Sequence, residues 1–492
     1  MPNRHGAARV SGSGAAPGAH VKASAPWMPA PWLARVCRPP SADSHPSERV
    51  HAMKANFAKK TVGGFNFEFA RGISTQRAGA AEFGECMETL QRIKNGDFES
   101  WTAEWAATAA AVAGYATKVA ATGDRWSGAN AHLRASNYFR MAAFYVAHTD
   151  PRHRQLWQRS RDHFLEMAKL GARTIEYAEI DFEGSKLPAY FVPAGGEGRP
   201  TLIAIGGFDS TMEEVYCWVG AVAAEYGWNC LIFEGPGQWG ALMENPGLVF
   251  RPDYEKPMAA AVDYLYSRQD IDRDKIALIG YSAGGYFAPR AASGEPRIKA
   301  CIANTLVVDC GESARAGLKG LSNPRVIDAM FGVLQKFSPP ARWGFQHAQW
   351  SLGIAKPHDW ISFYRPFTLR GLEQNFRNPM LFLFGEDDIK DAAASSAAIV
   401  AGIPEFIASL PCDRYLHVFP RTQGASSHCQ IGGLTYAHVV IFQWLDHVFS
   451  GGPVPANDLG APAQAVVGLF GKYGGKLASA RTQELLRSAT LI

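Results

Sequence analysis

Between residues 173 and 450 the sequence alternates short apolar runs with longer segments of helical pattern. Residues 174–180 alternate apolar and polar side chains and are followed, after Glu183-Gly184, by the run 187–192, which predicts an antiparallel pair of strands. Later runs are almost entirely apolar, as strands buried on both faces should be (residues 202–205, 230–233, 276–279, 301–303, 380–384 and 415–419). Apolar strands that alternate with crossover helices form a parallel sheet. We therefore predict an α/β fold over residues 173–450.

The segments outside this sheet have other patterns. Residues 1–52 are rich in Ala, Pro, Gly and Ser and predict a disordered extension. Met53 follows, so we interpret the extension as an artefact of the gene model, with a transit-like leader as the alternative. Residues 65–170 carry apolar side chains at helical spacing and predict a helical N-terminal domain. A stretch at about 306–375 is too long for a crossover loop and predicts a cap insertion, and residues 451–492 predict a tail or helix.

Composition argues against several classes of partner. The 492 residues include 49 Lys and Arg and 45 Asp and Glu without a clustered basic stripe, so we expect no nucleic acid. The eight cysteines form no C-x-x-C pair, which argues against zinc and disulfide scaffolds and predicts a reducing, cytoplasmic compartment. No apolar run approaches the ~20 residues of a membrane span, so we expect no membrane partner. A homodimer is one assembly that we consider.

A serine stands at a sharp turn after one of the predicted strands. Residues 280–285 read GYSAGG, directly after the strand at 276–279 and before an apolar helical segment. Between a strand and a helix, the G-x-S-x-G pattern indicates a nucleophilic serine, because small neighbours allow a tight turn that exposes the serine hydroxyl. We predict that Ser282 is a nucleophile. The Ala283 N–H is then one donor of an oxyanion hole.

A serine hydroxyl needs a histidine base and an orienting carboxylate, which should follow it in the order acid, then histidine. The strand at 380–384 runs into three acidic residues, of which Asp388 is our first choice and Asp387 our second. His428 lies in a loop after the last predicted strand, whereas the other late histidines lie in a strand or a helical run (His417, His438 and His447). We predict that His428 is the general base and then the general acid.

Other loops at this edge of the sheet supply further candidates. Residues 206–211 read GGFDST, and we predict that the Phe208 N–H is the second oxyanion donor. The turn 234–238, which reads EGPGQ, is at least as well explained by structure as by substrate contact. Asp309 and Glu312 follow the next strand, and we favour a surface charge over an extra catalytic carboxylate for them.

These segments together resemble a subfamily of α/β hydrolases. It includes bacterial 2,6-dihydroxypseudooxynicotine hydrolase, esterases of the fermentation-respiration switch type and fungal hydrolyases that shorten aromatic polyketides. The resemblance covers about residues 65–450 and is carried by six segments (residues 96–101, 134–138, 206–214, 233–238, 280–285 and 428–430). It implies an α/β-hydrolase fold, a mostly parallel sheet with helices on both faces, with an N-terminal helical cap domain over the active site.

The resemblance also suggests residues for the substrate pocket. Tyr138 and Asn137 belong to a matching segment of the helical region and are expected to reach the pocket. Tyr281, beside the nucleophile, is a further substrate-binding candidate. Trp239 is another, and it stands where relatives often carry a small residue, so the shape of the pocket is expected to differ.

The leading functional prediction is hydrolysis of a small apolar or aromatic carbonyl compound by Ser282, Asp388 and His428, without a cofactor or metal. Ser282 attacks the carbonyl, or His428 activates a water that does so. Carbon–carbon cleavage must expel a carbanion and ester cleavage an alkoxide, and the sequence leaves both open. An acyltransferase with the same triad and a catalytically silent hydrolase-fold interaction protein are the alternatives.

Overall fold

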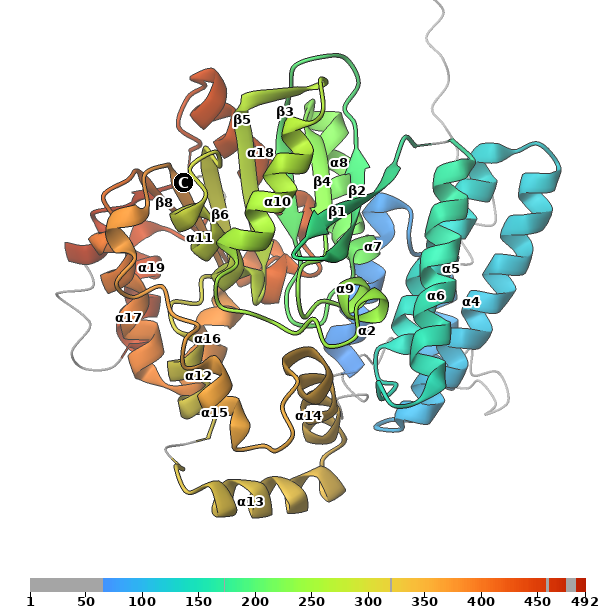
Figure 1. Ribbon diagram of the computed structural model, residues 1–492, viewed down its shortest axis with the longest axis horizontal. Coiled ribbons are helices and arrows are strands. Elements are labelled where there is room, and N and C mark those ends of the chain that lie inside the picture. Colours follow the sequence, from blue (N-terminus) through green and yellow to red (C-terminus); the bar gives the residue numbers. More distant parts are fainter. Residues whose placement is uncertain (1–64, 172, 319–320, 457–459, 475–483) are drawn as a thin grey trace, which may run out of the picture. The chain divides into compact units, whose positions relative to one another are not determined.

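The computed structural model describes residues 65–171, 173–318, 321–456, 460–474 and 484–492, all of which belong to one compact unit at 57–492. The extension predicted over residues 1–52 lies outside the described residues. One sheet of nine strands has the order β1-β2-β4-β3-β5-β6-β7-β8-β9 within the described part (Figure 1). The strands are β1 (Glu176–Phe182), β2 (Ser185–Val192), β3 (Arg199–Ile205), β4 (Asn229–Phe233), β5 (Ile271–Tyr281), β6 (Ala300–Asn304), β7 (Met380–Gly385), β8 (Arg414–Phe419) and β9 (Thr490–Leu491).

The pairing of the strands confirms the predicted mixture of directions. β1 is antiparallel to β2 and β2 is antiparallel to β4, whereas each later neighbouring pair runs parallel. β5 begins at Ile271, earlier than the apolar run predicted at 276–279. β9 was not predicted, and its Leu491 pairs with Leu416 of β8.

Both faces of the sheet are buried, and this explains why the strand sequences are continuously apolar. Successive side chains of a strand point to opposite faces. In β3, Ile203 packs in one apolar cluster, whereas its neighbours Leu202 and Ala204 pack in a second cluster on the other face. In β5, Leu278 and Ile279 divide in the same way. A solvent-facing sheet would have required alternating polar residues instead.

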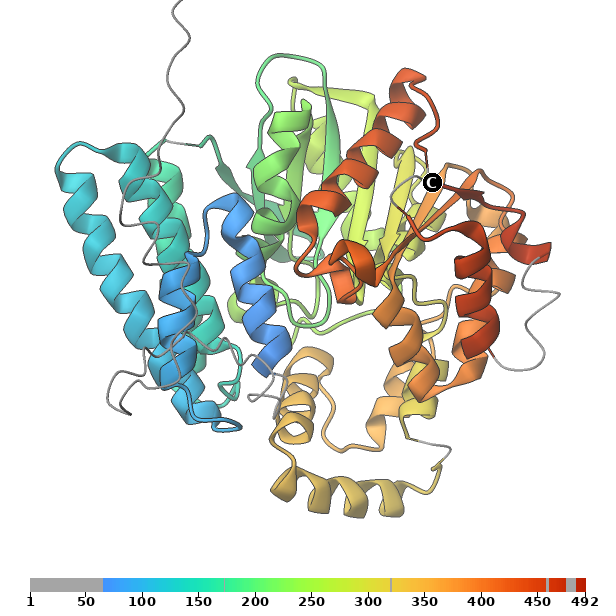
Figure 2. The same cartoon turned by 180° about the vertical axis from the view of Figure 1, so that it is seen from behind.

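Helices cover each face of the sheet (Figures 1 and 2). One face packs against α10 (Glu255–Tyr266), α11 (Gly284–Gly294), α17 (Ala397–Ser409) and α19 (Ala463–Tyr473). The other face packs against α7 (Met212–Val215), α8 (Ala221–Ala223) and α18 (Leu434–Ser450). The predicted α/β-hydrolase fold class is therefore confirmed. Shorter elements complete the domain: α9 (Trp239–Glu244), α16 (Glu386–Ser395), η4 (Tyr216–Gly220), η5 (Ala224–Tyr226), η6 (Glu373–Asn375), η7 (Arg421–Gln423) and η8 (His428–Gln430).

The N-terminal part of the described chain is helical. It comprises α2 (Phe65–Ser74), η3 (Thr75–Ala78), α3 (Phe83–Arg92), α4 (Phe98–Ala121), α5 (Arg125–Ala143) and α6 (Pro151–Lys169). The three long helices begin at aspartate caps, since the side chains of Asp97, Asp124 and Asp150 each accept a backbone N–H of the first turn. Trp101 and Trp105 are fully buried in the apolar core of this helical region. This core is formed mostly by the helices and is completed by Trp239 and Met243 of α9.

The segment between β6 and β7 also forms helices rather than a loop. They are α12 (Cys310–Gly317), α13 (Pro324–Phe337), α14 (Pro339–Leu352) and α15 (Asp359–Tyr364). On α13 the buried Ile327 faces inward, whereas Val333 is 58% exposed and Phe337 82% exposed. The Trp343 indole N–H of α14 donates to the Phe144 carbonyl at 2.7 Å, which ties this insertion to the N-terminal helical region.

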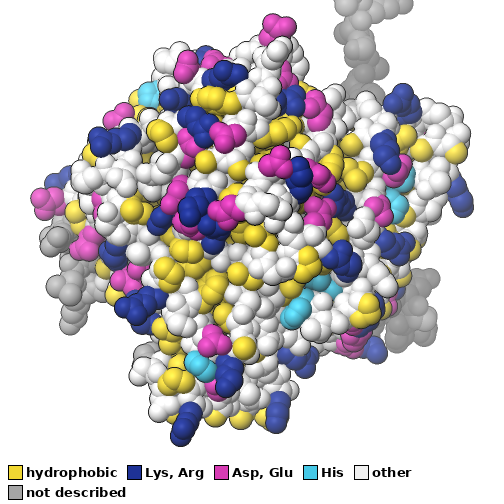
Figure 3. Space-filling view, viewed as in Figure 1, with side chains coloured by type: hydrophobic (Ala, Val, Ile, Leu, Met, Phe, Trp, Pro, Cys, Tyr) yellow, Lys and Arg dark blue, Asp and Glu magenta, His cyan; other side chains and the backbone are white. Residues whose placement is uncertain are grey.

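The cysteines of the described chain are free thiols, and all except Cys310 are buried. Burial raises the pKa of the Cys86 and Cys217 thiols to about 12. No described helix is both long enough and apolar enough to cross a membrane. Figure 3 shows basic and acidic side chains interspersed over one face of the protein.

Candidate active site

Ser282 occupies the turn between β5 and α11 in a strained backbone conformation. Its φ of 59° lies in the left-handed region, which is costly for a residue with a side chain. The turn is held on both sides, because the Ser282 N–H donates to the Asn304 carbonyl at 2.6 Å and the Gly285 N–H donates to the Ser282 carbonyl at 2.8 Å. Ser282 lines the cavity described below.

The glycines around Ser282 are required by close backbone contacts. A Cβ at Gly280 would lie 2.1 Å from the Gly284 carbonyl oxygen, and one at Gly285 would lie 1.7 Å from the Thr305 carbonyl oxygen. In the facing loop, a Cβ at Gly207 would lie 2.6 Å from the Ser282 Cβ. These contacts give the physical reason for the small residues in the GYSAGG segment.

The structure brings His428 and Asp388 together. His428 begins η8 after the last long strand, and its Nδ1 lies 2.5 Å from Oδ1 of Asp388 in the first turn of α16. The other carboxylate oxygen of Asp388 accepts the Thr305 hydroxyl at 2.8 Å and the Gly385 N–H at 2.9 Å. With Nδ1 bound to the carboxylate, Nε2 is the nitrogen of His428 that remains for another partner.

These contacts also shift the pKa of both groups. Burial alone would raise the pKa of Asp388, but the charge of His428 and the hydrogen bonds outweigh it, so the pKa of Asp388 is lowered. Burial alone would lower the pKa of His428, but the neighbouring Cys429 and Asp388 hold the pKa of His428 well above its ordinary value. The pair therefore favours a carboxylate beside an imidazole that is ready to carry a proton.

Asp387, the second choice for the acid, has different partners. Its carboxylate forms an ion pair with Arg421 and accepts the Ser426 hydroxyl at 2.8 Å, and Lys390 lies 3.6 Å away. In the described chain, no contact joins it to His428. The structure therefore places Asp388, rather than Asp387, beside the histidine.

The two predicted oxyanion donors belong to segments that meet beside Ser282. Ala283 follows Ser282 directly, and Phe208 lies in the loop after β3, next to Gly207, which contacts the Ser282 turn. Both residues line the same cavity as Ser282. Among the described residues, neither backbone N–H has a hydrogen-bond acceptor. Two free N–H groups beside a serine are suited to binding a developing negative charge.

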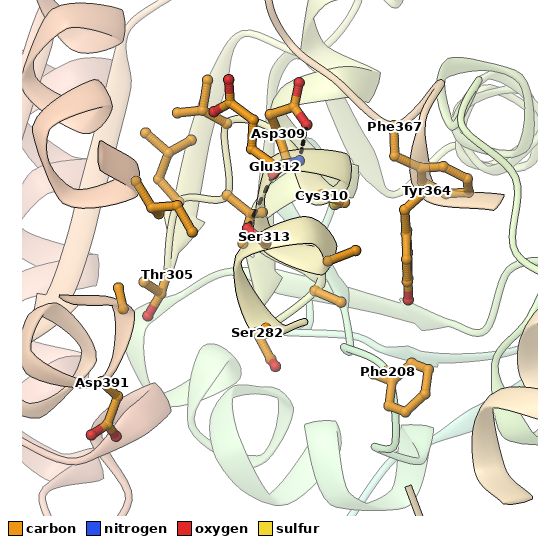
Figure 4. Close-up of a pocket in the computed structure, with 18 of the residues that line it drawn as sticks. Phe208, Ser282, Thr305, Asp309, Cys310, Glu312, Ser313, Tyr364, Phe367 and Asp391 are labelled. Carbon is orange, nitrogen blue, oxygen red and sulfur yellow. Dashed lines mark hydrogen bonds between the residues drawn. The ribbon is translucent and has the colours of Figure 1, made fainter. Parts of the chain in front are cut away.

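The cavity has a volume of about 750 Å³ and is mainly apolar. Its aromatic residues come from the sheet domain and from the insertion between β6 and β7 (Phe208, Phe250, Phe287, Phe331, Trp360, Tyr364, Phe367 and Phe384). Figure 4 shows Ser282 and Thr305 in the same hollow as Asp309 and Tyr364. Asp309 accepts the Glu312 N–H as the cap of α12, and Glu312 pairs with Arg370 at 3.0 Å. Both carboxylates line the cavity but already have partners.

The structure places the proposed substrate-binding residues elsewhere. Tyr138 is fully buried among the N-terminal helices, where its hydroxyl donates to Glu85 at 2.7 Å. Tyr281 is buried against Trp218, because it ends β5 on the face opposite to the cavity. Neither lines the cavity.

Trp239 and Asn137 are likewise away from the cavity. Trp239 packs against His153 and Trp350 between the N-terminal helices and α14. The Asn137 amide donates to the Ala80 carbonyl at 2.9 Å and therefore serves the fold of the helical region. Both residues therefore contribute to packing within the protein and not to the wall of the cavity.

The N-terminal helices do not form the wall of the cavity. None of its lining residues belongs to the described part of residues 65–170. Helix α2 is the nearest part, since the Phe67 ring lies 6.4 Å from the His428 ring and Arg71 contacts Asp209. The insertion between β6 and β7 supplies the cap residues of the cavity instead.

Sequence reasoning missed two polar groups that hold the site together. The Thr305 hydroxyl fixes Asp388, and its position after β6 was the only available signal. The buried Asn304 and Gln430 side chains form reciprocal amide hydrogen bonds of 2.6 and 3.2 Å. This amide pair connects the histidine loop to the end of β6, where the Asn304 carbonyl accepts the Ser282 N–H. No group of three or more His, Cys, Asp or Glu side chains that could hold a metal is present in the described ranges.

Comparisons with known proteins show what this chain is similar to. The chain is 31% identical over 418 residues to the hydrolase acrC of Aspergillus aculeatus, covering 78% of this chain and 96% of that protein. It is 31% identical over 409 residues to the 20-hydroxy-prefusarin hydrolase FUS2 of Gibberella moniliformis, with the same coverage. It is also 32% identical over 328 residues to the hydrolyase poxO of Penicillium oxalicum, covering 62% of this chain and 77% of that protein.

A solved structure shares the fold. The 2,6-dihydroxy-pseudo-oxynicotine hydrolase superposes with a TM-score of 0.59 at 20% sequence identity, covering 77% of this chain and 97% of that chain. No family model matches the sequence. The resemblance inferred from the sequence motifs is therefore confirmed by the fungal relatives, and the solved structure shows the shared fold.

Proposed function

This chain belongs to the α/β hydrolases, in the family of its fungal hydrolase relatives, and from that premise we propose that Ser282, His428 and Asp388 are its catalytic triad. The observation that carries the proposal is the 2.5 Å contact between His428 Nδ1 and Asp388 Oδ1, at the wall of the cavity that Ser282 also lines. A buried carboxylate on Nδ1 fixes the tautomer in which Nε2 can accept the serine proton.

The proposed reaction begins when Ser282 Oγ attacks the substrate carbonyl carbon while His428 Nε2 takes the hydroxyl proton. The carbonyl oxygen becomes an oxyanion that the Phe208 and Ala283 N–H groups stabilise. Collapse of this intermediate breaks the bond to the leaving group, which receives the proton from His428. Water then attacks the acyl-enzyme with His428 as base, and the carboxylic acid and free Ser282 are released.

The proposed substrate is an apolar ketone or ester of the polyketide type. The aromatic lining of the cavity suits an apolar acyl group. The relative FUS2 is named a 20-hydroxy-prefusarin hydrolase. The same triad serves an ester, which expels an alkoxide, and a β-diketone, whose carbanion is delocalised over the second carbonyl. The two reactions differ in whether His428 protonates oxygen or carbon.

We also propose that the protein works in a reducing compartment such as the cytoplasm. Its described cysteines are free thiols, and such thiols persist where disulfides are kept reduced. Imaging of the tagged protein in its own cells tests this proposal, and accumulation outside the cell would contradict it.

Labelling with an aryl fluorophosphonate tests the triad. The wild-type protein should be labelled at Ser282 and lose all turnover of aryl esters, and Ser282→Ala should be neither labelled nor active. Ser293→Ala, in helix α11 after the Ser282 turn, is the matched control and should behave as wild type. A Ser282→Ala protein that keeps its turnover would exclude the triad.

A substrate panel then separates the reactions. Aryl β-diketones and aryl esters of equal size are compared by kcat/KM, with the products identified by mass spectrometry. A preference for diketones assigns carbon–carbon hydrolysis, and a preference for esters assigns an esterase. Acyl transfer to an added alcohol in place of water would identify an acyltransferase.

A further inference from the structure

The loop between β3 and α7 is held by side chains from two other parts of the protein. Gln238, only 1% exposed, donates from Nε2 to the carbonyl oxygens of Gly206 at 3.0 Å and Gly207 at 3.4 Å. The His347 ring in α14 donates from Nε2 to the Phe208 carbonyl at 2.9 Å. Burial lowers the pKa of His347, so the neutral ring is the form that makes this contact. Three consecutive carbonyl groups of the loop therefore have fixed partners.

These contacts determine where the Phe208 N–H points. In a trans peptide the C=O of Gly207 and the N–H of Phe208 point in opposite directions. Gln238 is buried and binds the Gly207 oxygen, so the Phe208 N–H is directed away from Gln238. The loop lies against the Ser282 turn, since a Cβ at Gly207 would lie 2.6 Å from the Ser282 Cβ, and Phe208 lines the same cavity as Ser282.

Arg71 reaches the same loop from α2 in the N-terminal helical region. Its side chain is 4% exposed, and Nη1 donates to Oδ1 of Asp209 at 3.1 Å. Nε and Nη2 bind the two carboxylate oxygens of Glu214 in α7 at 2.7 and 2.6 Å. A planar guanidinium can hold both carboxylates at fixed angles, whereas the point charge of a lysine cannot. Arg71 thus fixes Asp209, the residue after Phe208, relative to the start of α7.

We propose that Arg71, acting through Asp209, is a positioning residue that, with Gln238 and His347, holds the Phe208 N–H in its oxyanion-binding position. The inference rests on the proposed function, because Phe208 must serve as an oxyanion donor. It assigns a role to α2, which contributes no residue to the cavity wall. The N-terminal helical region acts on catalysis by supporting the oxyanion loop.

Asp209→Ala is the central test, because the Asp209 side chain, at 25%, is the most exposed of the three carboxylates that pair with Arg71. Loss of an oxyanion donor costs about 10²–10³-fold in kcat, so a misplaced donor should lower kcat by about 10–100-fold while KM changes little. Asp209→Asn keeps an acceptor for Arg71 and should restore most of kcat. Asp270→Ala removes a similar carboxylate, paired with Arg268 at the far end of β5, and should leave kcat unchanged.

An aryl trifluoromethyl ketone, which forms a tetrahedral adduct with serine, distinguishes positioning from general destabilisation. Its inhibition constant should rise in Asp209→Ala by the same factor by which kcat/KM falls, whereas the Ki of the matching methyl ketone should stay the same. Counting active sites with fluorophosphonate corrects kcat for unfolded protein. Arg71→Lys should weaken the adduct as Asp209→Ala does.

The outcomes separate this inference from the proposed function. If wild-type protein is not labelled by fluorophosphonate, the triad itself fails. If wild type is labelled but Asp209→Ala and Arg71→Lys bind the trifluoromethyl ketone as tightly as wild type, the positioning role is excluded and the triad stands. Equal weakening of the methyl ketone and the trifluoromethyl ketone would also exclude it, because that result indicates a distorted pocket.

Discussion

Asp387 and Asp388 are neighbours in the chain, but only the Asp388 carboxylate contacts His428. We expect Asp388→Asn to lower kcat on the order of 10⁴-fold, less than the loss on His428→Ala, because the carboxylate orients the imidazole and does not take its proton. Asp387→Asn is the control and should leave kcat within a few-fold of wild type. Steady-state kinetics measure both, and a larger loss with Asp387→Asn would reverse the assignment of the acid.

The raised pKa of His428 predicts the pH dependence of activity. The base must be unprotonated, so kcat/KM should fall on the acid side with a midpoint above the ordinary histidine pKa of about 6.5. Removing the Asp388 charge should lower the pKa of His428, so the acid limb of Asp388→Asn should move to lower pH. The pH profile of kcat/KM for the two proteins checks this shift. An unmoved limb would mean that another group controls it.

Glu68 belongs to a buried cluster in which three carboxylates face two guanidinium groups (Glu68, Asp209, Glu214, Arg71 and Arg140). Burial raises the pKa of Glu68 to about 7, against the attraction of Arg71 and with the repulsion of Asp209. The folded state therefore holds this proton more tightly than the unfolded chain, whose carboxyl has a pKa of about 4.3. The stabilisation that comes from this tighter proton binding is fully present below the unfolded-state pKa, and it is lost as the pH rises through the folded-state pKa of about 7.

A glutamine at position 68 cannot titrate, so the Glu68→Gln variant should not lose stability in this way as the pH rises. Between pH 5 and 8 the wild-type free energy of unfolding should fall relative to the variant by a few kcal/mol, at about 1.4 kcal/mol per unit of pKa. Urea unfolding at several pH values gives this difference. Glu166→Gln, on the exposed face of α6, should follow wild type at every pH. Parallel curves for wild type and Glu68→Gln would show that Glu68 does not titrate in this range.

At the residue scale, local sequence patterns predicted those site residues whose position is set by neighbouring residues in the chain. Ser282 and His428 lie at fixed points of a strand–turn–helix and of a loop after a strand, and the fold brings them to one cavity. Tyr138 and Trp239 could not be placed in this way, because the face on which a side chain packs depends on neighbours distant in sequence. The contact of Arg71 with Asp209 spans 138 positions and has no local signal.

At the scale of elements, the insertion between β6 and β7 supplies much of the cavity wall. Phe331 of α13 lines the cavity, whereas Val333 on the same helix is 58% exposed. Phe331→Ala should enlarge the pocket and shift the kcat/KM ratio of large to small aryl substrates by about 10-fold toward the large ones, because such pocket contacts discriminate by roughly 1–3 kcal/mol. Val333→Ala should leave this ratio unchanged. An equal shift in both variants would show that substitutions in α13 change the ratio by destabilising the helix and not by removing a contact in the pocket.

Element types were more predictable than their ends. The parallel strands have continuous apolar runs because both faces of the sheet are covered, and these runs were visible in the sequence. The start of β5 at Ile271 was not visible, since Asp272, Arg273 and Asp274 extend the strand beyond the covered part of the sheet. The two-residue β9 is set by its pairing with β8, a contact that no local pattern encodes.

At the scale of the whole molecule, the N-terminal helices and the sheet domain share buried charges. Deleting residues 1–170 would remove both guanidinium partners of Glu214 and expose the apolar surface of the sheet domain that Phe164 and Met167 cover. We expect this truncated protein to be insoluble or inactive, as measured by the soluble fraction and by esterase activity.

Deleting residues 1–52 is the matched control and should leave solubility and activity unchanged. The two truncations are compared in the same host with the same substrates. A soluble protein without residues 1–170 that keeps wild-type kcat and substrate range would show that the helical region supports neither the fold of the sheet domain nor its site.

The reactivity of the buried cysteine thiols can be used to measure when parts of the protein unfold. Only a thiolate reacts readily with iodoacetamide, and the high pKa and burial of Cys86 and Cys217 suppress that form in the folded state. Cys310 lines the cavity and is less buried than the other described cysteines, but burial raises its pKa well above the ordinary thiol value, so it should also react slowly in the folded protein. Alkylation of Cys86 and of Cys217, read by mass spectrometry over time, would then report separately when the helical region and the sheet domain unfold.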